Sequence, residues 1–461
     1  MVPIVACGLL PPGSPSVLDY VATPGNGELR VSVTVAGGPR PIAWVGFGAS
    51  PLAAGLQSRR IDQVTARTVA GGALGVRAVG DDAYRVDVTT DDAWVLEYRA
   101  VIGAPPADFY HRASSSSDDH MMLVGVDVWA RFFDAPAAIS APPTDRPLGN
   151  VAEAGIRFDV SGLPDDWIVV SAAHEVALNQ FELSDHPARS VFALGPYRYH
   201  DIDRGLGLRA AIHPGWNVGR RHLVGYARQL ARAQARHFGP PPGDPALMIF
   251  TPFPSSVTPR QGVRTAGMVW DRSLLLFAGA DRSAPLNDRR VLEMLAIFLG
   301  HEIFHLYVPW GLAVTQPLSW LSEGWAEHVG RTSAQTARLL NASGADRSLR
   351  EAYARYLEMG GARAGSLQNA SEAGEDLRPL LYVRGALVFR ILSLEWAASG
   401  KPGSFGSAFW LRLMTEYDGD TPLEPEAVSR ILSAMVSPST VRRLVDGAAV
   451  ITLPELKLGR R

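Results

Sequence analysis

The 461-residue sequence predicts an α+β protein, in which a β-rich first part leads into a mixed middle part and a helical last part. Apolar and polar residues alternate repeatedly up to about residue 165, as they do in half-buried strands. Strand-like segments then precede a long apolar helix, and beyond residue 340 apolar residues recur at helical spacing. We therefore expect an N-terminal β-sandwich-like domain at 1–165, a mixed domain at 166–340 and a C-terminal α-helical domain at 341–461.

The strands expected in the first part alternate between apolar and polar side chains, and the clearest are 29–35, 84–90 and 94–101. Gly-Asn-Gly, Gly-Gly-Pro and Gly-Asp-Asp separate such segments as turns. Residues 114–119, Ser-Ser-Ser-Ser-Asp-Asp, are typical of a polar loop. We expect the neighbouring His120 at the surface rather than among the ligands of a metal.

The middle part continues with strands and one helix before the chain becomes mainly helical. Strands are expected at 167–171, 190–194, 208–213, 246–251 and 268–277, and a helix at 217–237. Amphipathic helical stretches follow at 347–358, 378–398, 405–416 and 425–435. Between these groups lies an apolar helix, which Asn287 or Asp288 can cap and Pro309 can end.

His301, Glu302 and His305 form a His-Glu-x-x-His motif near the end of that apolar helix. Residues four apart lie one above the other on a helix, so both imidazoles can reach one Zn²⁺ at about 2.0–2.1 Å. Glu302 projects from the same helix, where it can hold the water that attacks a peptide bond. Buried imidazoles need polar partners, and one metal ion supplies them. Histidines paired by hydrogen bonds in a buried helix are the alternative.

The segment Leu-Ser-Glu323-Gly-Trp-Ala-Glu327 supplies candidates for a third ligand, because its two carboxylates share one face of a helix. Catalytic zinc keeps three protein ligands and one open position. We assign Glu323 to one Zn²⁺ per chain, and Glu327 to a hydrogen bond with the other ring nitrogen of His301. A solvated surface carboxylate is the alternative for Glu327. Gly330 can cap the end of this helix.

Composition limits the partners and the kinds of site. The net charge of −2 gives no electrostatic reason to bind nucleic acid or an anionic membrane surface. No apolar run reaches the roughly 18 residues of a transmembrane segment. Cys7 is the single cysteine, so we expect neither a disulfide framework nor a thiolate cluster. Residues 4–7 fit the cleavage box of a bacterial lipoprotein, which favours the cell envelope, and the cytoplasm is the alternative.

Three motifs connect the chain to a known family: His-Glu-Ile-Phe-His at 301–305, Trp-Leu-Ser-Glu-Gly-Trp at 320–325 and Tyr-Val-Arg-Gly at 382–385. With these motifs the chain resembles the glycyl aminopeptidase family of gluzincin zinc metallopeptidases. The resemblance implies a thermolysin-like zinc peptidase domain in the middle of the chain. It also implies that Tyr382 donates to the oxyanion, the alternative being a core tyrosine on an apolar helix. Many members add a C-terminal PDZ domain, which we do not expect here.

The chain departs from that family in the segment Ala-Gly-Met-Val-Trp at 266–270. The family has a glutamate at the position of Val269, where it pairs with the free α-amine of the substrate. An apolar side chain cannot offset the desolvation of an ammonium group. Asp271 lies two residues further on and is a candidate substitute. Gly267, Met268 and Val269 are still expected to offer backbone groups to an extended peptide.

These residues together predict a zinc-dependent metallopeptidase that acts on peptide or protein substrates. Glu302 is the expected general base and Tyr382 the expected oxyanion donor. Because of Val269, cleavage by an aminopeptidase or by an endopeptidase stays open, and so does the oligomeric state. The alternatives are a catalytically weak or inactive zinc-containing peptide-binding protein on a peptidase fold, and hydrolysis of a non-peptide amide or epoxide.

Overall fold

The computed structural model divides the chain into two compact units. The first is Met1–Arg198, Ala211–Gly215 and Ile249–Thr258, and the second is Tyr199–Ala210, Trp216–Met248 and Pro259–Arg461. The described residues are 18–37, 42–47, 60–80, 83–103, 114–133, 154–183, 187–243, 246–253, 262–270, 272–281, 286–309, 311–361, 366–372, 377–417 and 421–458. Cys7 and Asp271 lie outside them, so the roles expected of both stay predictions, as does a division into three domains.

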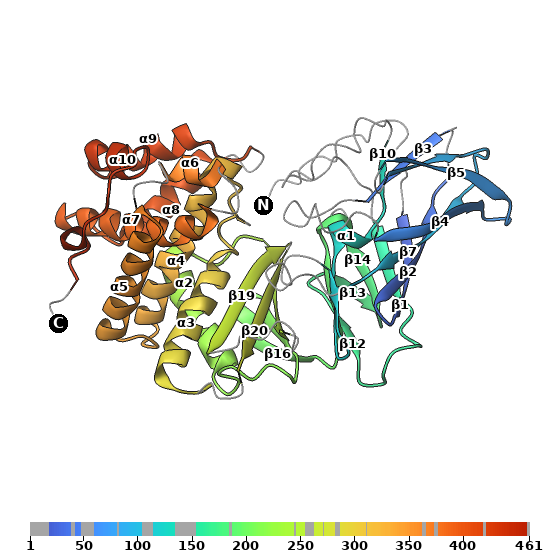
Figure 1. Cartoon of the computed structure of the whole chain (residues 1–461), viewed down its shortest axis with the longest axis horizontal. Helices are drawn as coiled ribbons and strands as arrows, with labels where there is room; N and C mark the ends of the chain where they lie inside the picture. The colour runs from blue at the N-terminus through green and yellow to red at the C-terminus, as the bar shows by residue number, and fades with distance from the viewer. Residues whose placement is uncertain are drawn as a thin grey trace. The chain divides into compact units, whose positions relative to one another are not determined.

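The first unit consists mainly of β-strands (Figure 1). Among the described residues, 11 strands pair in the order β10-β3-β6-β5-β4-β7-β2-β1-β11-β14-β13. Their bounds are β1 Leu18–Gly25, β2 Glu28–Val35, β3 Ile42–Gly46, β4 Ile61–Thr68, β5 Ala73–Gly80, β6 Ala83–Asp87, β7 Trp94–Val101, β10 Arg131–Phe133, β11 Ala154–Phe158, β13 His174–Ala177 and β14 Gln180–Leu183. A second sheet pairs in the order β12-β15-β9-β8, with β8 Ser115–Ser116, β9 Met121–Val124, β12 Ile168–Val170 and β15 Val191–Gly195. The short helix α1 (Gly125–Val128) follows β9 directly.

Alternation of apolar and polar side chains explains the larger sheet. In β2 every second side chain is buried, and these are Leu29, Val31, Val33 and Val35. β2 pairs antiparallel with β7, where Leu96 lies opposite Val33 and is also buried. One face of the sheet therefore contributes to an apolar core, as the period of two predicts.

A further sheet has five strands in the order β16-β17-β18-β20-β19 within the described part of the chain. The bounds are β16 Arg198–Asp203, β17 Leu208–Ile212, β18 Ala246–Pro252, β19 Val263–Trp270 and β20 Ser273–Ala280. β19 and β20 form an antiparallel hairpin in which Trp270 pairs with Ser273. The single strand expected at 268–277 is therefore wrong, because the chain reverses after Trp270. β20 is buried almost throughout, so its apolar run lacked the alternation that marks a separate strand.

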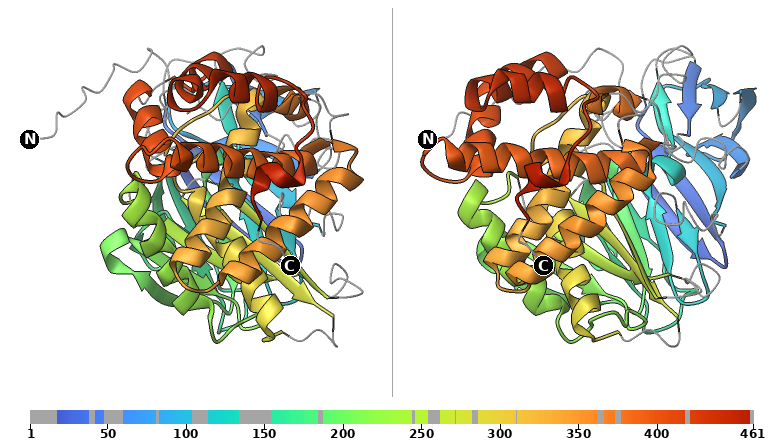
Figure 2. Two further views of the ribbon diagram at one scale, coloured as in Figure 1. Left: turned by 90° about the vertical axis from the view of Figure 1, so that its left-hand side faces the viewer. Right: turned by 60° about the vertical axis from the view of Figure 1, so that its left-hand side comes forward.

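Helices make up most of the second unit, and Figure 2 shows them, from green to red, gathered against one another. Their bounds are α2 Leu223–Phe238, α3 Arg289–Phe304, α4 Ser319–Thr336, α5 Ala342–Glu358, α6 Leu367–Glu372, α7 Arg378–Ala398, α8 Phe405–Glu416, α9 Pro425–Met435 and α10 Pro438–Leu444. α7, α8 and α9 have the predicted bounds, whereas α5 starts earlier because Asn341 accepts a hydrogen bond from the Gly344 N–H and caps it. Among the described helices, none combines the length and the apolar character that crossing a bilayer requires.

Two contacts between glycines and their neighbours allow α4 to lie close to both α3 and α7 (Figure 1). A Cβ atom on Gly330 would lie 2.6 Å from the carbonyl oxygen of Ile297 on α3. A Cβ atom on Gly324 would lie 2.5 Å from the Cα atom of Gly385 on α7. Only glycine permits such short separations. The C-cap role expected of Gly330 is therefore wrong, since α4 continues to Thr336 and Gly330 serves the packing against α3.

Candidate metal centre

Helix α3 carries the His-Glu-x-x-His motif into the interior of the second unit. The carboxylate of Asp288 caps this helix by accepting a 2.8 Å hydrogen bond from the Val291 N–H. His301 and Glu302 lie in the last turn, and His305 follows it. All three side chains are buried, and the Nε2 atoms of the two imidazoles are 3.1 Å apart. The two rings therefore face one common point.

Helix α4 brings Glu323 to the same point. The Oε2 atom of Glu323 is 3.4 Å from Nε2 of His301 and 3.5 Å from Nε2 of His305. Ligands placed tetrahedrally at about 2.0–2.1 Å from Zn²⁺ are about 3.3 Å from one another. Oε2 is buried and has no hydrogen-bond partner among the described residues. The three atoms thus form a triangle of the size that one zinc ion requires, and the donor set of two imidazoles and a carboxylate suits that ion.

The ring orientations also suit a metal. Nδ1 of His305 is 2.9 Å from the carbonyl oxygen of Val308 and donates its hydrogen to it, which leaves a lone pair on Nε2. Nδ1 of His301 is 3.6 Å from Oε1 of Glu327, longer than a hydrogen bond, so the bond expected here is not formed. The other oxygen of Glu327 instead pairs with Arg331 at 2.8 Å. Glu327 therefore acts on His301 through its charge.

The strand β19 passes directly beside Glu302. A Cβ atom on Gly267 would lie 2.1 Å from the carboxyl group of Glu302, so a side chain at this position would displace that carboxyl group. Successive side chains on a strand point to opposite faces, so Val269 shares the face of Gly267, and Met268 points the other way. Glu302 also lies within 4.8 Å of both imidazoles. Glu302 is therefore close to the two imidazoles on one side and to the strand on the other.

Tyr382 on α7 lies against the first imidazole. Its ring is stacked on that of His301, with ring centres 5.8 Å apart and planes inclined by 13°. Burial, and next the charge of Glu323, raise the pKa of the Tyr382 phenol well above its usual value. The phenol therefore keeps its proton at every physiological pH and is available as a hydrogen-bond donor.

Negative charge predominates around the two imidazoles. Burial lowers the pKa of His301, but Glu323, Glu302 and Glu327 outweigh burial and raise it to about 9. Burial raises the pKa of Glu302 above its usual value. Burial acts in the same direction on Glu323, but the imidazoles of His301 and His305 outweigh it and hold that pKa well below the usual range. Such a surplus of carboxylates favours a divalent cation at the centre.

Arg378, the first residue of α7, also belongs to this centre, although no motif pointed to it. Its Nη2 atom is 3.7 Å from Oε1 of Glu323. The spacing of four residues between Arg378 and Tyr382 is a signal that could have identified it, because residues i and i+4 share a helix face.

A second group with metal-binding atoms lies in the first unit, where Asp119, His120 and His213 offer atoms within 4.8 Å of one another. His120 is fully buried, so its expected place at the surface is wrong. The reason is a local network, in which Nδ1 of His120 lies 2.8 Å from Oδ1 of Asp119 and 2.9 Å from Oγ of Ser117. The His120 and His213 rings are also in edge contact, with centres 5.4 Å apart.

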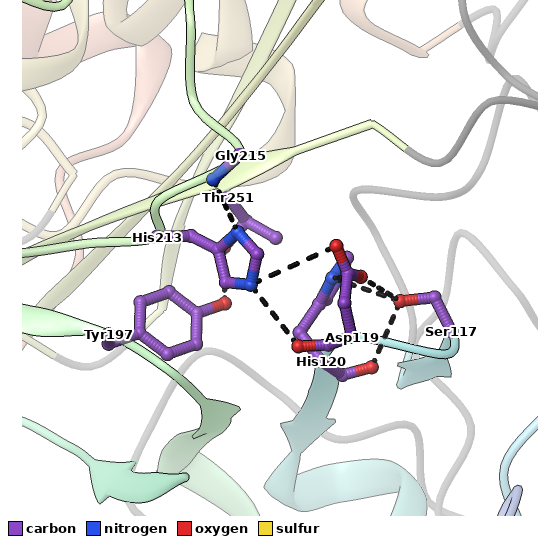
Figure 3. A network of polar contacts seen from close by, with 7 residues as sticks. All are labelled: Ser117, Asp119, His120, Tyr197, His213, Gly215 and Thr251. Atoms are coloured by element: carbon purple, nitrogen blue, oxygen red, sulfur yellow. Dashed lines mark hydrogen bonds and ion pairs between the residues drawn. The ribbon is translucent and has the colours of Figure 1, made fainter. Parts of the chain in front are cut away.

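The hydrogen bonds of His213, which Figure 3 shows, make this second group a poor zinc site. The Gly215 N–H donates to Nδ1 of His213 at 3.0 Å, so Nδ1 carries the lone pair and Nε2 carries the proton. Nε2 then donates to the backbone oxygen of Asp119 at 3.2 Å. The nitrogen that faces the group is therefore a donor, which is the reverse of the arrangement at His305. We infer that these hydrogen bonds stabilise the turn between β8 and β9.

Comparison with known proteins establishes the fold. No family model and no curated protein sequence matches the chain. The structure is similar to that of an aminopeptidase N family protein from Idiomarina loihiensis, with a TM-score of 0.76 and 14% identity over 95% of this chain and 77% of that one. It is also similar to an M1 zinc metallopeptidase from Deinococcus radiodurans, with a TM-score of 0.56 and 16% identity over 96% of both chains. A variant of the Deinococcus protein bound to a Tyr-Ser-Ala substrate matches with a TM-score of 0.57 and 16% identity. The chain therefore has the mixed α+β architecture of these peptidases, with large sheets and a helical C-terminal region.

Proposed function

We propose that this chain is a zinc-dependent metallopeptidase that hydrolyses peptide or protein substrates. The observation that carries the proposal is the triangle of His301, His305 and Glu323 beside the buried carboxylate of Glu302. A bound zinc ion would lower the pKa of water to about 7 and polarise the scissile carbonyl group. The similarity of the fold to M1 zinc metallopeptidases supports the same assignment. Membership of the glycyl aminopeptidases in particular stays a prediction.

Glu302 and Tyr382 have separate roles in the proposed reaction. Glu302 takes the proton from the attacking water and passes it to the leaving amine, and burial favours its protonated form during that transfer. Tyr382 keeps its own proton and donates a hydrogen bond to the oxygen that gains negative charge. One preorganised donor of this kind contributes about 3 kcal/mol to the transition state.

The strand β19 is the proposed binding surface for the peptide. Among the described strands it lies at one edge of its sheet, so one side of its backbone can pair with an extended substrate. Gly267, Met268 and Val269 would supply these groups beside Glu302. The apolar side chain of Val269 offers no negative charge to a free α-amine. We therefore propose that the main chain of the substrate dominates recognition, and that peptides with blocked and with free N-termini are both accepted.

The test is a comparison of the wild-type protein with Glu302→Gln on a peptide library, with Glu351→Gln on the exposed face of α5 as the matched control. We expect the first variant to retain zinc and to lose about 10³-fold in rate, because only the proton transfer is removed. The control is expected to behave as wild type. Zinc binding without any cleavage by the wild-type protein would instead indicate a peptide-binding protein on a peptidase fold.

The same library with and without N-terminal acetyl groups distinguishes the two modes of cleavage. Products from acetylated peptides would support recognition through the main chain of the substrate. Release of single residues from free peptides alone would show that the α-amine is bound despite Val269, and would support an aminopeptidase.

A further inference from the structure

We infer that Arg378 positions two groups of the metal centre at once, the carboxylate of Glu323 and the hydroxyl of Tyr382. The inference rests on the proposed function. It adds Arg378 as a residue that acts through Glu323, the proposed zinc ligand, and through Tyr382, the proposed oxyanion donor. No motif in the sequence includes Arg378.

The position of Arg378 allows both contacts. It opens α7 one turn before Tyr382, so the two side chains lie on the same face of that helix. Its Nη2 atom is 3.7 Å from Oε1 of Glu323, whose side chain is only 16% exposed. The close crossing at Gly324 and Gly385 brings Glu323, the residue before Gly324, near α7. Exposed ion pairs contribute little to stability, but screening by water is much reduced in this setting.

The first consequence is the orientation of the Glu323 carboxylate. Its Oε1 atom faces the guanidinium of Arg378, while Oε2 lies 3.4 Å and 3.5 Å from the Nε2 atoms of His301 and His305. A carboxylate held at one oxygen presents the other in a defined direction. Arg378 therefore favours binding of the metal through Oε2 alone.

The second consequence is the direction of the Tyr382 O–H group. Arg378 lies one turn before Tyr382 on the same face of α7, and its positive charge opposes the effect of burial by lowering the pKa of the phenol. A guanidinium has only donors, so a hydrogen bond between the two groups makes the oxygen of Tyr382 the acceptor. The phenolic hydrogen is then left to point elsewhere, toward the oxygen that gains charge in the reaction. The neighbouring cation also polarises the O–H bond and makes it a stronger donor.

The experiment compares Arg378→Met and Arg378→Lys with Arg412→Met, a charge loss on the exposed face of α8. We expect Arg378→Met to lower kcat about 10- to 100-fold with little change in KM, because the oxyanion donor loses its orientation. Arg378→Lys should restore only part of the rate, since one ammonium cannot reproduce the planar fork. Zinc content measured on each variant separates this effect from loss of the metal.

A double-mutant cycle with Tyr382→Phe shows whether Arg378 acts through the phenol. In the Tyr382→Phe background, Arg378→Met should cost no more than about twofold in kcat, because the hydroxyl that it orients is already gone. Effects that multiply at unchanged zinc content would overturn the action of Arg378 on Tyr382, and an Arg378→Met variant with normal kcat would overturn the whole inference.

Binding of a phosphinic pseudopeptide of alanine, whose anionic group mimics the tetrahedral intermediate, gives a second measurement without catalysis. Arg378→Met and Tyr382→Phe should each weaken its binding by calorimetry, and the two losses should not add. If the wild-type protein cleaves no peptide, the proposed function fails, while this measurement still decides the role of Arg378. Unchanged affinity, additive losses or no binding at all would contradict that role.

Discussion

At position 267 the backbone of β19 approaches the carboxyl group of Glu302 so closely that a single Cβ atom would overlap it. Glycine here leaves room for that carboxyl group, and a larger residue would displace the end of the Glu302 side chain. The same residue thus has two effects, since it keeps Glu302 free to move a proton and it brings the backbone of the edge strand beside the reacting bond. A residue without a side chain is in this way part of the active centre that we propose.

Replacing Gly267 by alanine tests this directly. We expect kcat/KM to fall about 100-fold, because the methyl group displaces Glu302 by a distance that matters for proton transfer. Zinc content should stay the same, since no ligand is touched. Ala266→Ser on the opposite face of the strand is the control and should keep its rate. A Gly267→Ala variant with wild-type activity would show that the distance between β19 and Glu302 does not affect proton transfer.

At the scale of the elements, the helix crossings determine where His301 and Glu323 meet. His301 follows Gly300 on α3, Glu323 precedes Gly324 on α4, and each of these glycines lies at a crossing. A Cβ atom on Gly300 would lie 2.8 Å from Oγ of Ser333 on α4. The helix axes can therefore approach closely enough for imidazole and carboxylate groups from different helices to share one metal ion.

Two glycine-to-alanine changes of opposite sign test the importance of these crossings. Gly324→Ala should destabilise the protein by about 1–3 kcal/mol, because the methyl group separates α4 from α7. Gly225→Ala on α2, where a Cβ atom would meet nothing within 4 Å, should stabilise by about 0.5–1 kcal/mol through helix propensity. Unfolding in urea measures both. Equal effects of the two changes would contradict the close crossing.

His328 on α4 makes the stability of this helix dependent on pH. Burial, and next the charges of Arg390 and Arg331, lower its pKa from 6.5 to about 3. Between these values the unfolded chain binds a proton that the folded chain refuses, so stability falls as the pH drops from 6.5 toward 3.

The variant His328→Gln isolates this contribution. Relative to wild type it should gain up to about 2 kcal/mol between pH 7 and pH 5, because the unfolded state no longer takes up that proton. Urea unfolding of both proteins in EDTA at the two pH values measures the difference and removes any contribution from zinc. A constant difference would show that His328 titrates normally in the folded state.

Over the whole molecule the charges nearly balance, with a net charge of −2. The second unit nevertheless places Glu302, Glu323 and Glu327 around two imidazoles. In the first unit, Asp119 and two further imidazoles come equally close, yet hydrogen bonds already use the nitrogens there. We conclude that proximity of ligand-type residues is insufficient for a metal site and that protonation distinguishes the two groups.

Metal analysis of the purified chain should therefore give one zinc ion per molecule. His301→Gln should abolish this binding, and His213→Gln should leave it unchanged. Removal of zinc by a chelator should lower the Tm, because an ion present at 1,000 times its Kd stabilises the folded state by about 4 kcal/mol. Two zinc ions per chain, or loss of zinc in His213→Gln, would show that the second group binds metal.

Much of this protein could be predicted from spacing along the chain. The α+β class, the β-rich beginning and the bounds of α7, α8 and α9 followed from local periodicity, which depends on nearby residues only. The two histidines and Glu302 lie within one helical turn and a half, so their convergence is also a local property. The predicted surface position of His120 and the predicted single strand at 268–277 were wrong, because burial and chain reversal depend on partners distant in the sequence.

The sequence by itself determined which residues can bind a metal and which helices carry them, since helix geometry places residues i and i+4 together. Only the tertiary structure decided how Glu323 meets the imidazoles, how Arg378 meets Glu323 and how closely β19 approaches Glu302 at residue 267. These features arise where separate elements cross. Crossing distances depend on packing between segments far apart in the chain, and no spacing in the sequence encodes them.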